Sequence, residues 1–416
     1  MQKIKNLYNK YKTPILYSGG SVAKSIAQLI VGFAIAKFVA PDDFGLWTTI
    51  NLALTYALFL QAGIINGLNL ELPLAYGKED KRGGVLMAGT AQMFTLISSV
   101  LVFILGFLCF VFYPEENIKI KYGILAVTMV IALSYYQNYL MSTFRSNDSF
   151  SKLGYIQLID ALVNITTLSF VVYFSYYGLL MKAVVALLIY VLLLHFYRPI
   201  RVRLLWNKKA FIKLLKVGFP IFGLAYIASI AATADKIWLL KYASLTEVGL
   251  YSFGFFAFSS FMLFSTSIAS YIYPKMTYAF AKNGDKNALW LLVKKITVLL
   301  LLIQIPLSII GYYLIPIAVS NLFPDYVLSI PIMQILIFAG MFKGSVIGVN
   351  ALWSMKRWNY IIIYQITSSL ILVILTYIGA KYFSIRFIGV AYGLLLASFI
   401  SLILGFYLTF KATREK

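Results

Sequence analysis

The stretch VLMAGTAQMFTLISSVLVFILGFLCFVF, residues 85–112, contains no charged side chain and decides the fold class. A helix needs about 20 predominantly apolar residues to cross the ~30 Å hydrocarbon core of a bilayer, and this run is longer. Its apolar residues occupy every face of a helix, as do those of a second run at 296–315, whereas a helix packed on a soluble core keeps one polar face. Both runs therefore predict membrane-spanning helices.

The composition of the whole chain agrees with this prediction. Of 416 residues, 61% are hydrophobic and 12% are charged, and the mean hydropathy is +0.85, which excludes a soluble domain of this size. The single cysteine, Cys109, and the single histidine, His195, are too few for a disulfide framework, a zinc site or a hydrolase triad. The sequence also lacks the GxxxxGK[ST] phosphate loop of an ATP-driven pump.

Apolar segments of spanning length recur along the chain. We therefore predict an all-α polytopic membrane protein with about twelve transmembrane helices. The first segment is long enough to span, so we expect a retained span and not a cleaved signal peptide. The predicted spans are residues 15–38, 44–67, 84–112, 121–143, 153–175, 178–197, 218–240, 249–272, 290–316, 328–350, 360–380 and 387–410.

The basic residues predict which side of the membrane each loop faces. With an even number of spans both termini share a side, and the loops on that side carry 26 of the 36 Lys and Arg residues. The opposite loops carry Lys119, Lys121, Lys182, Lys241, Lys381 and Arg386. Cytoplasmic loops are enriched in Lys and Arg, so we expect both termini in the cytoplasm. The net charge of +22 then reflects topology and contact with anionic lipid headgroups, and we expect no nucleic-acid partner.

Two segments of the chain match each other. Residues 37–47, KFVAPDDFGLW, align without gaps on residues 241–251, KYASLTEVGLY, and each follows the first span of its half. A second matching pair, around Pro73 and Pro274, follows the second span of each half. Six spans return the chain to its starting side, so the order predicts a parallel repeat. Such a repeat has two six-helix lobes, related by an axis along the membrane normal, with a central cavity between them.

We expect these lobes at residues 1–197 and 218–416. The connection between them, residues 198–217, carries seven Lys and Arg residues together with apolar side chains such as Leu204 and Trp206. Basic residues on an amphipathic stretch are typical of a helix that lies on a membrane surface. We therefore predict that 198–217 is a basic, amphipathic cytoplasmic linker that forms a surface-lying helix.

At these residues the chain resembles a known family. Residues 38–47, the segment ELPLAYGK at 71–78 and the segment VGLY at 248–251 look like the polysaccharide-transporter branch of the multidrug/oligosaccharidyl-lipid/polysaccharide (MOP) exporter superfamily. The resemblance covers essentially the whole chain through its length, span number and cytoplasmic termini. Wzx-type members of this branch are flippases for undecaprenyl-pyrophosphate-linked O-antigen or capsule repeat units.

The resemblance implies a transporter of the bacterial inner membrane, not an enzyme. Such a transporter moves a lipid-linked oligosaccharide from the cytoplasmic to the periplasmic leaflet by alternating access, in lipopolysaccharide or capsule synthesis. It needs no cofactor and is driven by an ion gradient, with H+ or Na+ as the candidate ion, or by the membrane potential. Membrane lipids, a polysaccharide polymerase and a chain-length regulator are the further implied partners.

Three alternatives remain open. Two are a lipid II exporter and a multidrug exporter of the same superfamily. The third is a membrane glycosyltransferase or polymerase, which would need catalytic carboxylates beside a sizeable loop. This third alternative is disfavoured, because no predicted loop exceeds about 20 residues.

Charged residues inside the predicted spans mark the candidate site. A charge at mid-bilayer costs about 3 kcal/mol on insertion scales, so it generally faces a bundle interior or a water-filled cavity. Lys24 shares one helical face with Ser21 and Gln28, and Lys343 shares a face with Asn350. We predict that these five residues line the substrate cavity.

The remaining candidates have two interpretations each. Asp160 could bind a coupling ion or neutralise a lysine across a gap, and Asp235 is a second ion-coupling candidate beside Lys236, a further cavity candidate. Arg145 and Arg357 could receive the pyrophosphate or could simply follow the topology rule. The interior lysines outnumber the carboxylates, which favours an anionic solute over an organic cation. We expect no metal site.

Overall fold

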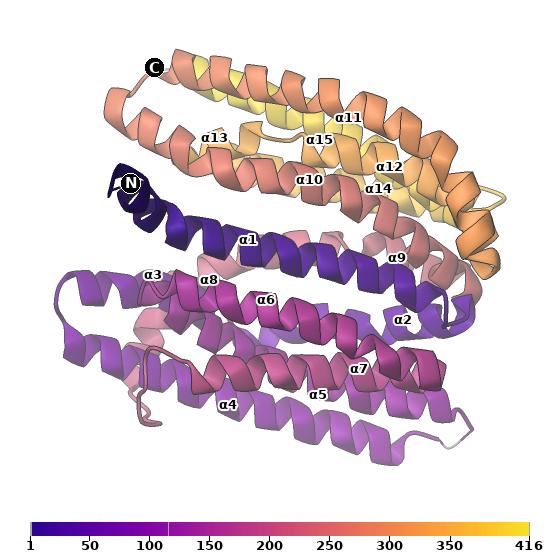
Figure 1. Ribbon diagram of the computed structural model, residues 1–416, viewed down its shortest axis with the longest axis horizontal. Coiled ribbons are helices and arrows are strands. Elements are labelled where there is room, and N and C mark those ends of the chain that lie inside the picture. Colours follow the sequence, from indigo (N-terminus) through magenta and orange to yellow (C-terminus); the bar gives the residue numbers. More distant parts are fainter. Residues whose placement is uncertain (1, 115, 416) are drawn as a thin grey trace. The chain divides into compact units, whose positions relative to one another are not determined.

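The structure of the chain is a computed structural model that describes residues 2–114 and 116–415 (Figure 1). Side chains are described from Gly19 onward, apart from several between 267 and 283. The N-terminal lysines of the orientation argument and the side chain of Pro274 in the second matching pair lie outside this description. Every regular element of the described residues is helical, as predicted.

The helices follow one another along the chain with short connections (Figure 1). Their bounds are α1 (Gln2–Ala36), α2 (Pro41–Ala57), η1 (Leu58–Gln61), α3 (Ile64–Gly77), α4 (Lys81–Phe112), α5 (Ile118–Ser146), α6 (Phe150–Thr166), α7 (Leu168–Phe196), α8 (Lys208–Ala231), α9 (Ala234–Tyr242), α10 (Leu245–Asn283), α11 (Lys286–Leu322), η2 (Pro324–Ser329), α12 (Ile330–Gly344), α13 (Gly348–Ser354), α14 (Trp358–Tyr382) and α15 (Arg386–Arg414).

The described helices are those of a multi-pass membrane protein. Ten of them, counting α8–α9 and η2–α12–α13 as one each, are long and apolar enough to cross a bilayer, and the bent pair 41–61 and 64–77 raises this number to eleven. Large apolar side chains such as Leu162, Phe174 and Leu302 are more than half exposed. Exposure of so many apolar side chains to water would be unfavourable, whereas the hydrocarbon core of a bilayer accommodates an apolar surface.

The fifth predicted span, residues 153–175, has no single counterpart among these helices and corresponds to α6 and the start of α7. Helix α6 ends at Thr166, which makes it too short to cross on its own. Within α7, Ser175 has non-helical torsions (φ 47°, ψ −117°). A Cβ added at Gly178 would lie 2.8 Å from the backbone nitrogen of Val171. In a continuous helix residues seven apart are about 10 Å apart along the axis, so the chain folds back at Ser175 between the two predicted spans.

Side-chain caps define where several helices begin. The carboxylate of Asp80 accepts a hydrogen bond from the Gly83 amide at 2.8 Å at the start of α4. At the start of α10, Ser244 and Glu247 exchange hydrogen bonds in a capping box. Each cap satisfies amide groups that have no partner inside the helix and that a bilayer cannot solvate.

The chain divides into two compact units. Unit 1 comprises residues 1–39 and 50–226, and unit 2 comprises residues 40–49 and 227–416. The core of unit 1 is built from fully buried leucines on α3, α5, α6, α7 and α8, namely Leu68, Leu140, Leu153, Leu194 and Leu214. One core of unit 2 joins α10, α11 and α13 through Met276, Val293, Leu300, Ile347 and Ala351.

The connection 198–217 differs from its prediction. Its first half is not helical, and α8 begins inside it and continues into the next predicted span. Leu214 is fully buried in unit 1, and Lys213 forms an ion pair of 2.6 Å with Glu71 of α3. The prediction of a surface-lying helix is therefore wrong, because the apolar side of this segment packs on α3 within unit 1.

The two matching motifs meet each other in unit 2. The hydroxyl of Thr246 donates a hydrogen bond to the carboxylate of Asp42, its equivalent in the 37–47 motif. A Cβ added at Gly45 would lie 2.9 Å from the amide nitrogen of Gly249, and one added at Gly249 would lie 3.0 Å from the amide nitrogen of Gly45. Such reciprocal contacts between equivalent positions define a local two-fold axis and support the predicted internal repeat.

Candidate functional site

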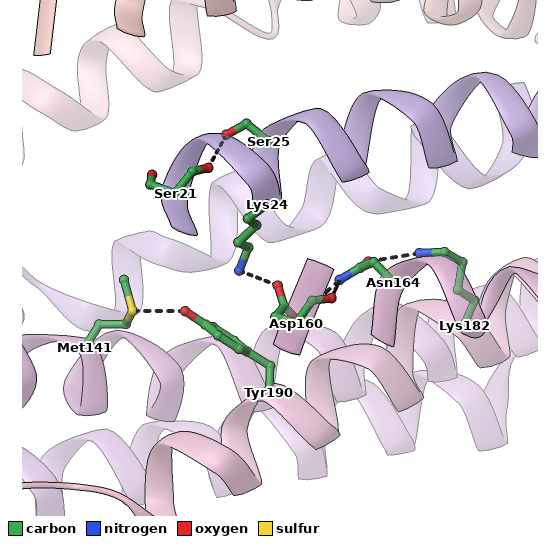
Figure 2. A network of polar contacts seen from close by, with 8 residues as sticks. All are labelled: Ser21, Lys24, Ser25, Met141, Asp160, Asn164, Lys182 and Tyr190. Atoms are coloured by element: carbon green, nitrogen blue, oxygen red, sulfur yellow. Dashed lines mark hydrogen bonds and ion pairs between the residues drawn. The ribbon is translucent and has the colours of Figure 1, made fainter. Parts of the chain in front are cut away.

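Lys24 of α1 lies at the centre of a polar network in unit 1 (Figure 2). Its ammonium group is 2.9 Å from a carboxylate oxygen of Asp160 on α6 and 3.8 Å from the centre of the Tyr190 ring on α7. The amide of Asn164 donates to the Asp160 carboxylate at 3.2 Å, and Lys182 donates to the Asn164 carbonyl oxygen at 3.1 Å. We call these five residues the Lys24 network.

Close backbone packing allows these helices to share a network. A Cβ added at Gly20 would collide with the backbone of Gly154, so α1 and α6 approach each other closely one helical turn before Lys24. Asp160 and Asn164 are four residues apart and therefore lie on the same face of α6. Tertiary packing thus brings Lys24 of the first predicted span to Asp160 of the fifth.

The sequence analysis counted Lys182 with the outer loops although the predicted span 178–197 contains it, and this count is wrong. Its side chain is 7% exposed and lies within α7. The span prediction and the apolar run on both sides of Lys182 in the sequence are the signals of an interior residue. With this correction, the Lys24 network holds two lysines and one carboxylate.

The predicted companions of Lys24 behave differently from Lys24. Ser21 and Gln28 are both exposed, whereas Lys24 is partly buried. The carbonyl oxygen of Ser21 accepts a hydrogen bond from the Ser25 hydroxyl at 3.0 Å (Figure 2). No contact of the described Ser21 and Gln28 side chains with the Lys24 network is found.

A second polar site lies in unit 2, around Asp235 of α9. The carboxylate, 3% exposed, accepts hydrogen bonds from the Tyr251 hydroxyl and from the Lys236 backbone amide, both at 2.8 Å. The ammonium group of Lys236 lies 5.1 Å from the centre of the Phe255 ring. Asp235 and Lys236 therefore have separate partners, as expected for neighbours that point about 100° apart on a helix.

Lys343 of α12 lies between two cavities of unit 2. The smaller, about 130 Å³, is lined by Lys343 together with Asp235, Ser398 and Ser401 among mainly apolar residues. The larger, about 400 Å³, is called the Lys343 cavity below. It is lined by Ala228, Ala231, Ala232, Lys343, Val346, Val349, Asn350, Tyr364, Gln365, Ser368, Ser369 and Leu372. Lys343 and Asn350, which the sequence analysis placed on one helical face, both line this cavity.

Two broken helices meet at these cavities. Helices α8 and α9 are separated at residues 232–233, and α12 and α13 are separated at residues 345–347. Ala232 lines both cavities, and Val346 lines the larger one. Non-helical backbone at membrane depth is tolerated where it lines a cavity, and discontinuous helices of this kind form solute sites in transporters. Lys343 also lies in the last turn of α12, where the helix dipole favours a cation.

The other predicted residues are not brought to these sites. Arg145 is exposed in the last turn of α5, and Arg357 precedes α14 as its N-cap residue. The described linings of the two cavities include neither arginine and do not include Lys236. The sequence analysis also missed the polar face of α14, whose signal is the spacing of Gln365, Ser368 and Ser369 at i, i+3 and i+4.

Comparison with solved structures identifies the fold. A lipid II flippase, MurJ, in an inward closed conformation has a TM-score of 0.74 with 18% identity, over 96% of this chain and 88% of that chain. An inward-facing multidrug resistance MATE family transporter of the MOP superfamily has a TM-score of 0.69 with 12% identity, over 94% of both chains. A mutant of the Vibrio cholerae MATE transporter VcmN has a TM-score of 0.63 with 14% identity, over 100% and 99% of the two chains.

Sequence comparison identifies the family. No curated protein matches the chain. Residues 34–330 match the family model described as polysaccharide biosynthesis protein, from the end of α1 to the start of α12. Since this match covers more than half of the 416 residues, and the fold is that of MOP-superfamily transporters, the chain belongs to the family of polysaccharide biosynthesis proteins.

Proposed function

We propose that the protein is a flippase that moves an undecaprenyl-pyrophosphate-linked oligosaccharide, an O-antigen or capsule repeat unit, from the cytoplasmic to the periplasmic leaflet. The observation that carries the proposal is the surplus of lysine over carboxylate inside the membrane-spanning helices. The Lys24 network has two lysines for one aspartate, and the helices of unit 2 add Lys343 and Lys236 to Asp235.

This surplus suits an anionic solute. The double negative charge of a pyrophosphate is the main barrier to its passage through hydrocarbon, and fixed ammonium groups in a poorly hydrated site lower that barrier. An organic cation would be repelled by the same groups. The lysines therefore favour a lipid-linked oligosaccharide over the multidrug substrates of the MATE transporters that share this fold.

The two carboxylates have different surroundings and are proposed to have different roles. Asp160 contacts Lys24, which favours the neutralising role among its two predicted ones. Asp235 accepts hydrogen bonds from a hydroxyl and a backbone amide, so we propose Asp235 as the residue that responds to a coupling ion, H+ or Na+. We propose that the protein lies in the inner membrane with both termini in the cytoplasm, as the sequence predicts. The basic loops then face the cytoplasm, from which the substrate is loaded.

Complementation tests the proposal. The chain is expressed in one strain that lacks its O-antigen flippase and in another depleted of its lipid II flippase. We expect restored surface polysaccharide in the first and no rescue of growth in the second. Lys343→Met should abolish the rescue at equal protein level, and Lys37→Ala, which changes an exposed lysine, should not. Rescue of the lipid II strain alone would overturn the substrate assignment in favour of lipid II.

A further inference from the structure

We propose that the Lys343 cavity is a subsite for one sugar ring that carries an oxyanion. The inference rests on the proposed function, because the ring would belong to the translocated oligosaccharide. The oxyanion is a carboxylate on the sugar or a phosphate attached to it, and both present the same chemistry to an ammonium group. Four properties of the cavity lead to this inference: its donors, its charge, its size and the small alanine side chains in its lining.

The donors come from one face of α14. Tyr364, Gln365, Ser368 and Ser369 all line the cavity, and their spacing places them on a single stripe of the helix. The side-chain amide of Gln365 donates a hydrogen bond to the Ser369 hydroxyl at 3.4 Å. The Ser368 hydroxyl donates a hydrogen bond to the backbone carbonyl oxygen of Gln365 at 3.3 Å. Both hydrogen bonds are longer than the usual 2.7–3.2 Å, so ligand hydroxyls can replace them at low cost.

The charge of the lining is positive. Lys343 is the charged residue among the described residues that line the cavity, and Asn350 adds a neutral donor and acceptor. An ammonium group in a protein cavity attracts an anion more strongly than it would in bulk water. The carboxylate of Asp235 lines the smaller cavity, which shares Lys343, and already accepts two hydrogen bonds there.

The volume admits a sugar ring. The cavity of about 400 Å³ is more than ten times the ~30 Å³ that one water molecule occupies in the liquid, so a monosaccharide ring with its substituents can enter it. Pyrophosphate alone would leave the α14 stripe without partners. Ala228, Ala231 and Ala232 also line the cavity, and their small side chains leave room for a ligand.

Direct binding tests the subsite. The purified full-length protein, in nanodiscs of zwitterionic lipid, is titrated with glucuronic acid, glucose 1-phosphate, glucose and inorganic pyrophosphate, and binding is measured by equilibrium dialysis. We expect glucuronic acid or glucose 1-phosphate to bind at least about tenfold more tightly than glucose, since the oxyanion accepts a charge-assisted hydrogen bond from the ammonium group that glucose cannot accept. Which of the two binds distinguishes a carboxylate on the sugar from a phosphate.

Variants connect this binding to the cavity. Lys343→Met should remove the tenfold preference, Lys343→Arg should keep most of it, and Lys37→Ala, which changes an exposed lysine, should not change it. Circular dichroism checks that each variant is folded. If Lys343→Met is unfolded, Gln365→Leu and Ser369→Ala replace it and should each weaken binding of the preferred sugar severalfold.

Three results would overturn the subsite. They are equal binding of glucose, equal binding of pyrophosphate alone, and preferred binding that survives Lys343→Met or both α14 variants. Absence of binding by all four probes would also overturn it. Such a failure is distinct from failure of the proposed function, because complementation would still succeed in that case. Conversely, a preserved preference without complementation would refute the flippase and leave the subsite in place.

Discussion

Replacing Lys24 by Met should destabilise unit 1, because it removes the cation that faces Asp160. The two charged groups are 2.9 Å apart, and the Asp160 side chain is only 4% exposed. At an effective dielectric constant of about 20, such a pair interacts by about 6 kcal/mol before the cost of desolvation is subtracted. Loss of one partner of a buried pair generally costs about 3–5 kcal/mol, since the other charge stays buried without compensation.

The expected value lies near the lower end of this range. The Lys24 side chain keeps 20% of its surface exposed, and Asn164 continues to donate to Asp160. For a domain of the size of unit 1, about 3 kcal/mol corresponds to a fall of about 6 °C or more in the thermal midpoint. Thermal unfolding of the purified protein in detergent, followed by circular dichroism, measures this change.

The double variant Lys24→Met with Asp160→Asn separates stability from transport. Without the carboxylate, no buried charge is left uncompensated, so the thermal midpoint should recover most of its loss. If Lys24 attracts the anionic substrate, this stable variant should still fail to restore surface polysaccharide. A Lys24→Met single variant as stable as the wild type would refute the ion pair. Full transport by the double variant would refute a substrate role for Lys24.

Three further predictions concern other parts of the chain. Lys182→Met should lower the free energy of unfolding by about 1–3 kcal/mol, because it removes one charged hydrogen bond and leaves the ion pair intact. The thermal midpoint should therefore fall less than in Lys24→Met. Gly45→Ala should destabilise the fold by about 1–3 kcal/mol through overpacking and so reduce the level of folded protein in membranes. Gly223→Ala, which has open space around it, should not reduce this level. In a variant without the native cysteine, a membrane-impermeant maleimide added outside intact inner membranes should label Lys119→Cys and not Lys208→Cys, and the reverse pattern would contradict the predicted orientation.

The fold class could be predicted from the sequence because hydrocarbon imposes a simple rule on each segment independently. Runs such as 85–112 must be helical and apolar whatever surrounds them, so their positions follow from composition alone. The breaks inside spans did not follow. Residues 232–233 and 345–347 are apolar or bear only a hydroxyl, so their composition does not predict a break in the helix. The helices are interrupted where Ala232 and Val346 line a cavity, and a cavity is a result of tertiary packing.

Only part of the candidate site could be predicted from the sequence, because tertiary packing decides which residues come together. Lys24, Asp160 and Lys343 are visible as single violations of the apolar pattern. Their partners are not visible, since partner choice depends on helix packing between segments more than a hundred residues apart. Lys182 was missed for another reason, because counting charges by side assigned it to the loop nearest in sequence. Its burial against Asn164 shows that it is an interior charge.

The contact between Gly45 and Gly249 explains why residues 37–47 and 241–251 are the clearest sequence match between the two halves of the chain. Both glycines lie within unit 2, where a side chain larger than hydrogen at either position would enter the backbone of its equivalent. Asp42 and Thr246 form a complementary pair in which one copy donates and the other accepts. Residues 37–47 and 241–251 therefore share a sequence because they share an interface.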